Sequence, residues 1–390
     1  MPRLSSLLFG GIACALLVAE GVMAQTRSYA AWAAESAMRR GQGKGLDASG
    51  NSLVNYEHGE LQWALRLLYE RTGNQTYYDY ILSGASNVVA DDGTVGGRYS
   101  LSDYSLDPLR TGPTFLYLYQ QTKDQKWKTA ADTFKKQLET HPRTAQGQFW
   151  HKKIYPYQGW LDGVYMGDVF YAQYVKDFQS TNVSAWGDIV NQIANMALMS
   201  IQVPGVQNYN GLLYHGYDYS KKAVWAAPDR GHSPEVWNRA LGWYTMALVD
   251  VLDILPDGSG RLQVLNIIQT LAPRIRDAAD KATGVWWLVM TQPGREGNYF
   301  ESSGSAMFVY SLLKAVRKGY VADYDGSIVR AATKAYNYMT ANWVIPNPDG
   351  TMGWTNTVMV GSLSGTGDYQ VFAQPSTPTK RANLAAITSK

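Results

Sequence analysis

The chain has 390 residues, of which 45% are hydrophobic and only 17% are charged, and its formal net charge is +3. A nucleic-acid-binding protein needs a dense basic patch, so this weak charge argues against nucleic acid as a partner. The aromatic residues are 27 Tyr and 13 Trp against 9 Phe. Tyr and Trp join a flat apolar face to a polar edge, which suits stacking on sugar rings and also suits an ordinary core.

The first 24 residues have the pattern of a secretory signal peptide. A short apolar run, 7–19, follows Arg3 and ends in small residues before Gln25. The run is too short for a membrane span, although an uncleaved anchor is the alternative. The single cysteine, Cys14, lies in this segment, so the mature chain has no disulfide and no cysteine ligand for a metal. We expect a secreted protein, or a periplasmic one in a bacterium, that is not membrane-bound after cleavage.

Helical periodicity continues through the rest of the chain. In the segment 59–70, Leu61, Leu65 and Leu68 share one face of a helix. Similar stripes predict about twelve helices, at 27–40, 59–70, 74–90, 109–121, 125–139, 163–178, 184–202, 240–256, 261–280, 303–318, 325–342 and, as a last short one, 366–374. No linker divides 25–390, which we interpret as a single all-α domain. Periodicity alone leaves a bundle, a solenoid and a closed toroid open, although the lack of a strict repeat disfavours a solenoid.

Two candidate carboxylates precede predicted helices. Asp162 stands just before a helix and shares an aromatic-rich stretch with His151, Lys152 and Trp160. An aspartate there often only caps the helix, and a helix N-terminus lowers its pKa, whereas a catalytic acid needs a raised pKa. Asp107 precedes a proline at another helix start, which is again compatible with a cap.

A third cluster, at 232–244, contains Trp237, Arg239 and Trp243. Positions 239 and 243 share a helical face, where an arginine and an indole could bind a carboxylate and stack on a ring, or could simply pack. His215 is a lone loop histidine. His58 stands near two glutamates, but its spacing is not HExxH, so we predict neither a metal nor a cofactor.

Taken together and in this order, the motifs resemble the unsaturated rhamnogalacturonyl hydrolases of glycoside hydrolase family 105. The segments carrying the resemblance are 141–174, with WLDGVYM, and 232–256, with WNRALGWY; the late GTGDYQVFA also looks like that family's closing helix. Family 88, the unsaturated glucuronyl hydrolases, is the nearest competitor. The resemblance implies an (α/α)6 toroid of about twelve helices, and a metal-free site for pectic oligosaccharides ending in a 4,5-unsaturated galacturonic acid.

The resemblance also implies roles for individual residues. Asp162 matches the general acid/base and Asp107 the second carboxylate. The remaining matches are to substrate-binding positions, with Tyr56 the weakest: Tyr56, His151, Lys152, Trp160, His215, Trp237, Arg239 and Trp243. In this mechanism Asp162 protonates C4 of the double bond, and water then adds at C5.

We expect Asp107, as a neighbouring like charge, to raise the pKa of Asp162. Three alternatives stay open: hydrolysis of unsaturated glycosaminoglycan fragments, sugar binding without catalysis, and a polysaccharide lyase on a similar toroid.

Overall fold

The computed structural model describes residues 28–363 and residue 365 as a set of helices linked by long loops. Eleven helices have ten or more residues within this part: α1 (Tyr29–Arg39), α2 (Tyr56–Thr72), α3 (Gln75–Ser86), α4 (Gly112–Thr122), α5 (Gln125–Thr140), α7 (Val169–Phe178), α8 (Val183–Ser200), α9 (Asn238–Val251), α10 (Ser259–Asp277), α11 (Ser302–Arg317) and α12 (Ser327–Asn342). They confirm eleven of the predicted helices. The predicted helix at 366–374 and the predicted signal peptide at 1–24 lie outside the described residues.

Short elements complete the described chain. Two single turns of 3-10 helix, η1 (Leu101–Asp103) and η2 (Asp107–Thr111), precede α4. A short helix α6 (Leu161–Gly163) runs through a π-helical turn, η3 (Val164–Asp168), into α7. Strands β1 (Gln158–Trp160) and β2 (Gly216–Asp218) form one antiparallel pair, and β3 (Val344–Pro346) and β4 (Met352–Trp354) form another.

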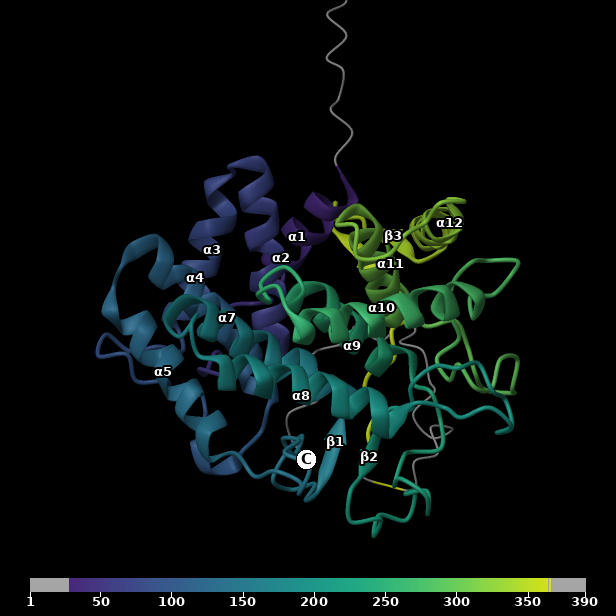
Figure 1. Ribbon diagram of the computed structural model, residues 1–390. Helices are drawn as coiled ribbons and strands as arrows, with labels where there is room; N and C mark the ends of the chain where they lie inside the picture. Colours follow the sequence, from purple (N-terminus) through teal and green to yellow (C-terminus); the bar gives the residue numbers. More distant parts are fainter. Residues whose placement is uncertain (1–27, 364, 366–390) are drawn as a thin grey trace, which may run out of the picture.

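The helices follow one another around a ring (Figure 1). In this view the chain passes from α3–α5 on the left, through α7–α9, to α10–α12 on the right, and returns beside α1. The ring closes through aromatic side chains, since the Tyr29 and Tyr336 ring centroids lie 6.4 Å apart and Trp32 Nε1 donates to the Gly350 carbonyl at 2.9 Å. This arrangement is the (α/α)6 toroid predicted from the sequence.

Burial separates inner from outer helices. Every residue of α9 is buried except Arg239, and α4, α7 and α11 are also mostly buried. The outer helices α1, α3, α5, α10 and α12 bury only one face, as expected for amphipathic sequences. Among the helices of the described part, none combines the length and apolarity needed to cross a membrane.

Loops at one end of the ring form a continuous belt of backbone hydrogen bonds. Ser105 pairs with Lys152, and β1 pairs with β2, whose Tyr217 pairs in turn with His232. The belt continues through the Trp237–Val289 and Trp287–Phe300 bridges. Loop residues far apart in sequence are thereby fixed against one another, which gives this end of the toroid a rigid surface.

Gly59 lets α2 approach η2 closely. A Cβ atom at position 59 would lie 2.4 Å from the Arg110 carbonyl oxygen. We therefore expect Gly59→Ala to lower the free energy of unfolding by about 1–3 kcal/mol through overpacking. Gly187, an exposed helical position in α8 where an added Cβ would have nothing within 4 Å, is the matched control. Because alanine favours a helix more than glycine does, Gly187→Ala should instead raise the free energy of unfolding by about 0.5–1 kcal/mol. Urea denaturation measures both, and equal shifts would contradict the close approach.

Candidate active site

Several residues of the candidate site lie at the N-terminal ends of helices. Tyr56 begins α2, Asp107 begins η2 just before α4, and Asp162 lies in α6 just before η3 and α7. Arg239 is in the first turn of α9, and Glu301 caps α11. Because a helix N-terminus has a partial positive charge, this convergence favours an anionic ligand.

Asp162 is held beside His215 by the β1–β2 pair. The Leu161 amide donates to the His215 carbonyl at 3.0 Å, directly after the register Trp160–Gly216. His215 Nε2 then lies 3.0 Å from Asp162 Oδ2, and the imidazole is fully buried while the Asp162 side chain is 19% exposed. A carboxyl reachable from solvent is thus oriented by a buried histidine 53 residues away in the chain.

The charge state of Asp162 differs from the prediction. Burial raises the pKa of its carboxyl, but the charge and hydrogen bond of His215 outweigh burial and leave the pKa below its ordinary value of 3.8. Asp107 does not counter this, because Lys152 Nζ contacts its Oδ2 at 2.5 Å and compensates its charge. The expectation of a raised pKa at Asp162 is therefore wrong for the unliganded protein.

Asp107 and its neighbours form a second polar group. The Leu106 amide donates to the His151 carbonyl at 3.1 Å, which places Asp107 Oδ1 3.7 Å from His151 Nε2. Burial lowers the pKa of Lys152, but Asp107 outweighs it, so the pKa lies above the ordinary value. Burial lowers the pKa of His151 to about 4, so this imidazole is neutral near pH 7.

A stack of three rings lies between these groups. The Trp160 indole has His151 at 4.5 Å and Tyr155 at 4.8 Å, both nearly parallel to it. His215 meets the same indole edge-on at 5.2 Å. Trp160 is only 5% exposed, so it lies beneath the surface of the site and supports it. The Tyr155 ring is partly exposed and forms part of that surface.

Arg239 joins three segments at the opposite side of the site. Its Nε donates to Ser303 Oγ at 2.7 Å, and its Nη2 lies 3.4 Å from Oε1 of the fully buried Glu301. Its guanidinium also donates to the carbonyls of Val358 and Met359. Most of its donors are engaged, so Arg239 is first of all an anchor for the loop before residue 360.

Tyr56 connects the two sides. Burial raises the pKa of its hydroxyl. The charges of Asp107 and Asp162 also raise this pKa, and the charge of Arg239 lowers it. Its ring meets the Trp243 indole edge-on at 6.2 Å, so Trp243, which is 6% exposed, lies behind it. The structure thus brings the predicted site residues to one end of the toroid.

Trp237, like His215, is deeply buried. It is 1% exposed, and the Gly361 backbone lies so close that a Cβ there would be 2.3 Å from the indole. The ring therefore offers no open face in this structure, and its binding role stays a prediction.

Three residues of the site were not expected from the sequence. Tyr155 and Glu301 were not singled out, and Glu57 was considered only for a metal. Burial raises the pKa of the Glu57 carboxyl, Arg239 lowers it and Asp107 raises it, which places Glu57 among the site charges. Its only sequence signal is its position next to Tyr56. Among residues 28–363 and 365, no three acidic, histidine or cysteine side chains gather in a group that could hold a metal ion.

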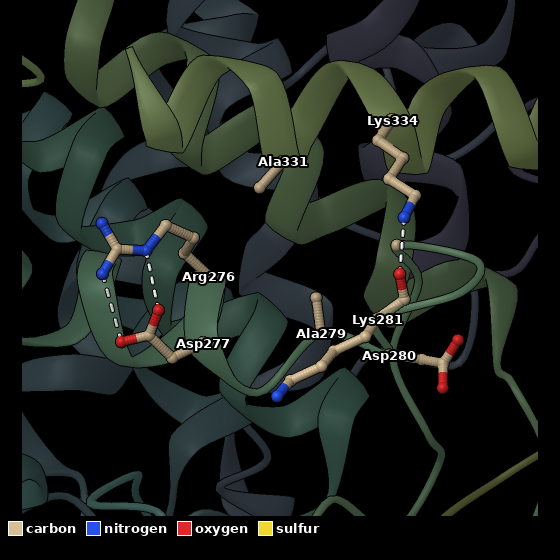
Figure 2. A pocket seen from close by; sticks show the side chains of 8 residues that line it. Arg276, Asp277, Ala279, Asp280, Lys281, Ala331 and Lys334 are labelled. Carbon is tan, nitrogen blue, oxygen red and sulfur yellow. Dashed lines mark hydrogen bonds and ion pairs between the residues drawn. The ribbon is translucent and has the colours of Figure 1, made fainter. Parts of the chain in front are cut away.

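A separate surface pocket lies away from this site. Figure 2 shows it between the end of α10 and α12. Its volume is about 430 Å³. Its charged groups are largely bound to each other and to the backbone: Arg276 Nε contacts Asp277 at 2.8 Å, and Lys334 Nζ donates to the Lys281 carbonyl at 2.6 Å. None of its lining residues is a predicted site residue.

Comparisons with known proteins agree with this geometry. The family model described as Glycosyl Hydrolase Family 88 matches residues 29–385. A solved family 105 glycoside hydrolase from C. acetobutylicum is 34% identical, with a TM-score of 0.81 over 89% of this chain and 93% of that one. The 24.9 kDa protein in the picA locus of Rhizobium radiobacter is 38% identical over 162 residues, 41% of this chain and 69% of that protein.

A more distant solved structure shares the fold. The unsaturated glucuronyl hydrolase from Bacillus sp. GL1 is 14% identical, with a TM-score of 0.60 over 84% of this chain and 86% of that one. The match to the family model and the C. acetobutylicum structure decide the assignment. The chain belongs to the glycoside hydrolases that the family 88 model describes and, among these, to family 105, as its motifs predicted.

Proposed function

We propose that this glycoside hydrolase acts on rhamnogalacturonan fragments that end in a 4,5-unsaturated galacturonic acid. The observation that carries the proposal is the Asp162 carboxyl, which is partly exposed, 3.0 Å from His215 Nε2 and beside the Tyr155–Trp160–His151 stack. An acidic sugar ring suits a site that joins aromatic faces to converging helix N-termini. Membership of family 105 supports the same substrate class.

The reaction is a hydration of the enol-ether double bond. Protonated Asp162 donates its proton to C4, and positive charge develops at C5 and the ring oxygen. The Asp162 carboxylate then accepts a proton from a water molecule as the water oxygen bonds to C5. The resulting hemiketal opens and releases the rest of the oligosaccharide, and Asp162 is protonated again for the next cycle.

Substrate binding should supply the raised pKa that the unliganded site lacks. The uronate carboxylate adds a negative charge near Asp162, which raises the pKa of that carboxyl. A general acid works when protonated, so the rate falls as the pH rises through its pKa. We expect the falling limb of kcat, which reports the bound enzyme, at a higher pH than that of kcat/KM, which reports the free enzyme. Coincident limbs in the two pH profiles would contradict this.

Loss of the ultraviolet absorbance of the conjugated double bond tests the function directly. Initial rates are compared on unsaturated galacturonyl-rhamnose and on unsaturated chondroitin disaccharides. A clear preference for the pectic disaccharide supports the proposal, and the reverse preference assigns the glucuronyl activity. Binding of either sugar with no loss of absorbance would identify a sugar-binding protein.

We also propose that residues 1–24 direct export and are removed, so that the mature protein begins at Gln25. The mass of the protein recovered from the medium or periplasm of an expressing cell tests this. A mass that includes residues 1–24 would contradict it.

A further inference from the structure

A groove of about 350 Å³ opens next to the ring stack. One wall is made by Ile154, Tyr155 and Gln158, and the other by Lys222, Val224 and Trp225. Ile154 is 72% exposed and Val224 is 83% exposed, so apolar side chains face solvent at its rim. Exposed apolar surface next to an active site is typical of a binding surface.

The groove adjoins the catalytic site through Trp160. Its Tyr155 ring stacks on Trp160, and its Gln158 side chain accepts a hydrogen bond from Trp160 Nε1 at 2.9 Å. The same Trp160 contacts His215, the partner of Asp162. The groove therefore lies three side-chain contacts from Asp162, close to where the sugars after a terminal ring at that carboxyl would lie.

Both walls are rigid before any ligand binds. Gln158 and Asp218 face each other in the β1–β2 pair, and Asp218 accepts from the amides of Lys222 at 2.9 Å and Ala223 at 2.7 Å. Trp225 Nε1 donates to the Leu363 carbonyl at 2.7 Å. Such a groove binds with little loss of conformational entropy.

Lys222 gives the groove its charge. The adjacent Lys221 ammonium is bound to the carbonyls of Pro228 and Asp229. The exposed Lys222 side chain, in contrast, makes no hydrogen bond or ion pair with any residue of the described chain. An ammonium that has no partner among the described residues, on a mostly apolar rim, suits an anionic group on a sugar.

We propose that this groove binds the sugars that follow the unsaturated uronate, and that Lys222 selects oligosaccharides with an anionic group there. That group is either the carboxylate of a second uronate or a sulfate. The inference rests on the proposed function and adds to it a preference for acidic fragments longer than a disaccharide.

A charge series at Val224 tests the proposal at an exposed position where folding should not be affected. The measured quantity is the ratio of kcat/KM on the unsaturated rhamnogalacturonan tetrasaccharide, which has a second galacturonate, to that on the disaccharide. Val224→Asp and Lys222→Met should each lower this ratio by about two- to five-fold, and Val224→Lys should raise it, as expected for exposed charge pairs. Higher salt should remove these differences. Unsaturated chondroitin disaccharides with and without sulfate, tested in the same way, separate the two anions.

Val183 is the matched control, because it is 82% exposed and lies at the start of α8, outside the groove. Val183→Asp should leave the ratio unchanged. A wild-type ratio near one, or equal ratios for Val224→Asp and Val224→Lys, would overturn the inference while leaving the proposed function intact. A protein that binds both pectic substrates but hydrates neither would contradict the proposed function instead, and the dissociation constants would then test the same charge series.

Discussion

Asp162→Asn is expected to lower kcat on the unsaturated disaccharide by about 10³- to 10⁴-fold, the upper range for the loss of a general acid–base group. The amide has nearly the same shape as the carboxyl and its oxygen can still accept a hydrogen bond from His215. It cannot donate a proton to C4 or accept one from water. KM should change little, because the aromatic stack and the helix N-termini are untouched.

Asp168 offers a matched control six positions further along the chain. It is 1% exposed, and burial raises the pKa of its carboxyl well above its usual range, which favours the neutral form. Asp168→Asn preserves the shape of this buried side chain and should retain activity within a few-fold. Loss of ultraviolet absorbance measures both variants. More than a tenth of the wild-type rate in Asp162→Asn would remove Asp162 from the mechanism.

The helices could be predicted because their information is local, whereas the toroid followed only from the family resemblance. Apolar residues at helical spacing, such as Leu61, Leu65 and Leu68, mark a helix face whatever the rest of the chain does. The π-helical turn at Val164–Asp168 could not be predicted in this way, because its sequence continues the helical pattern. It follows Asp162 directly, where a bulge in the hydrogen-bond pattern often accompanies a functional residue.

The sequence identified individual residues of the site, but not which of them contact one another. His215 appeared as a lone loop histidine, and its contact with Asp162, 53 positions away, exists because β1 and β2 pair. The Asp107–Lys152 contact likewise depends on a bridge between two loops. These long-range contacts fix the charges, so the sequence could not show that Lys152 compensates Asp107 or that His215 lowers the pKa of Asp162.

The contacts of Arg239 were also not predictable from the sequence, because its partners lie far away in the chain. Its helical spacing to Trp243 suggested a face shared by the two side chains, but its main partners are Glu301 and Ser303, more than 60 positions away. Glu301 is fully buried and also accepts from the amides of Ser303, Gly304 and Val358. A buried carboxylate that loses its cation is strongly destabilised.

We therefore expect Arg239→Met to lower the free energy of unfolding by about 3 kcal/mol. Adding Glu301→Gln removes the uncompensated charge, so the double variant should be more stable than Arg239→Met by about 1 kcal/mol or more. Urea denaturation of the two single variants and the double variant measures this coupling. Additive effects would show that the two side chains do not depend on each other.

Activity separates anchoring from binding in the same set of variants. Arg239 acts electrostatically on Tyr56 and Glu57, so its positive charge reaches the site that would hold the uronate. The double variant regains stability but not that charge, and KM for the anionic disaccharide should stay at least about tenfold above wild type, as expected when a charged hydrogen-bond donor is lost. If KM returns to the wild-type value together with stability, Arg239 only anchors the loop before residue 360. Other groups must then bind the uronate, and Lys152, the cation in contact with Asp107, is the first candidate.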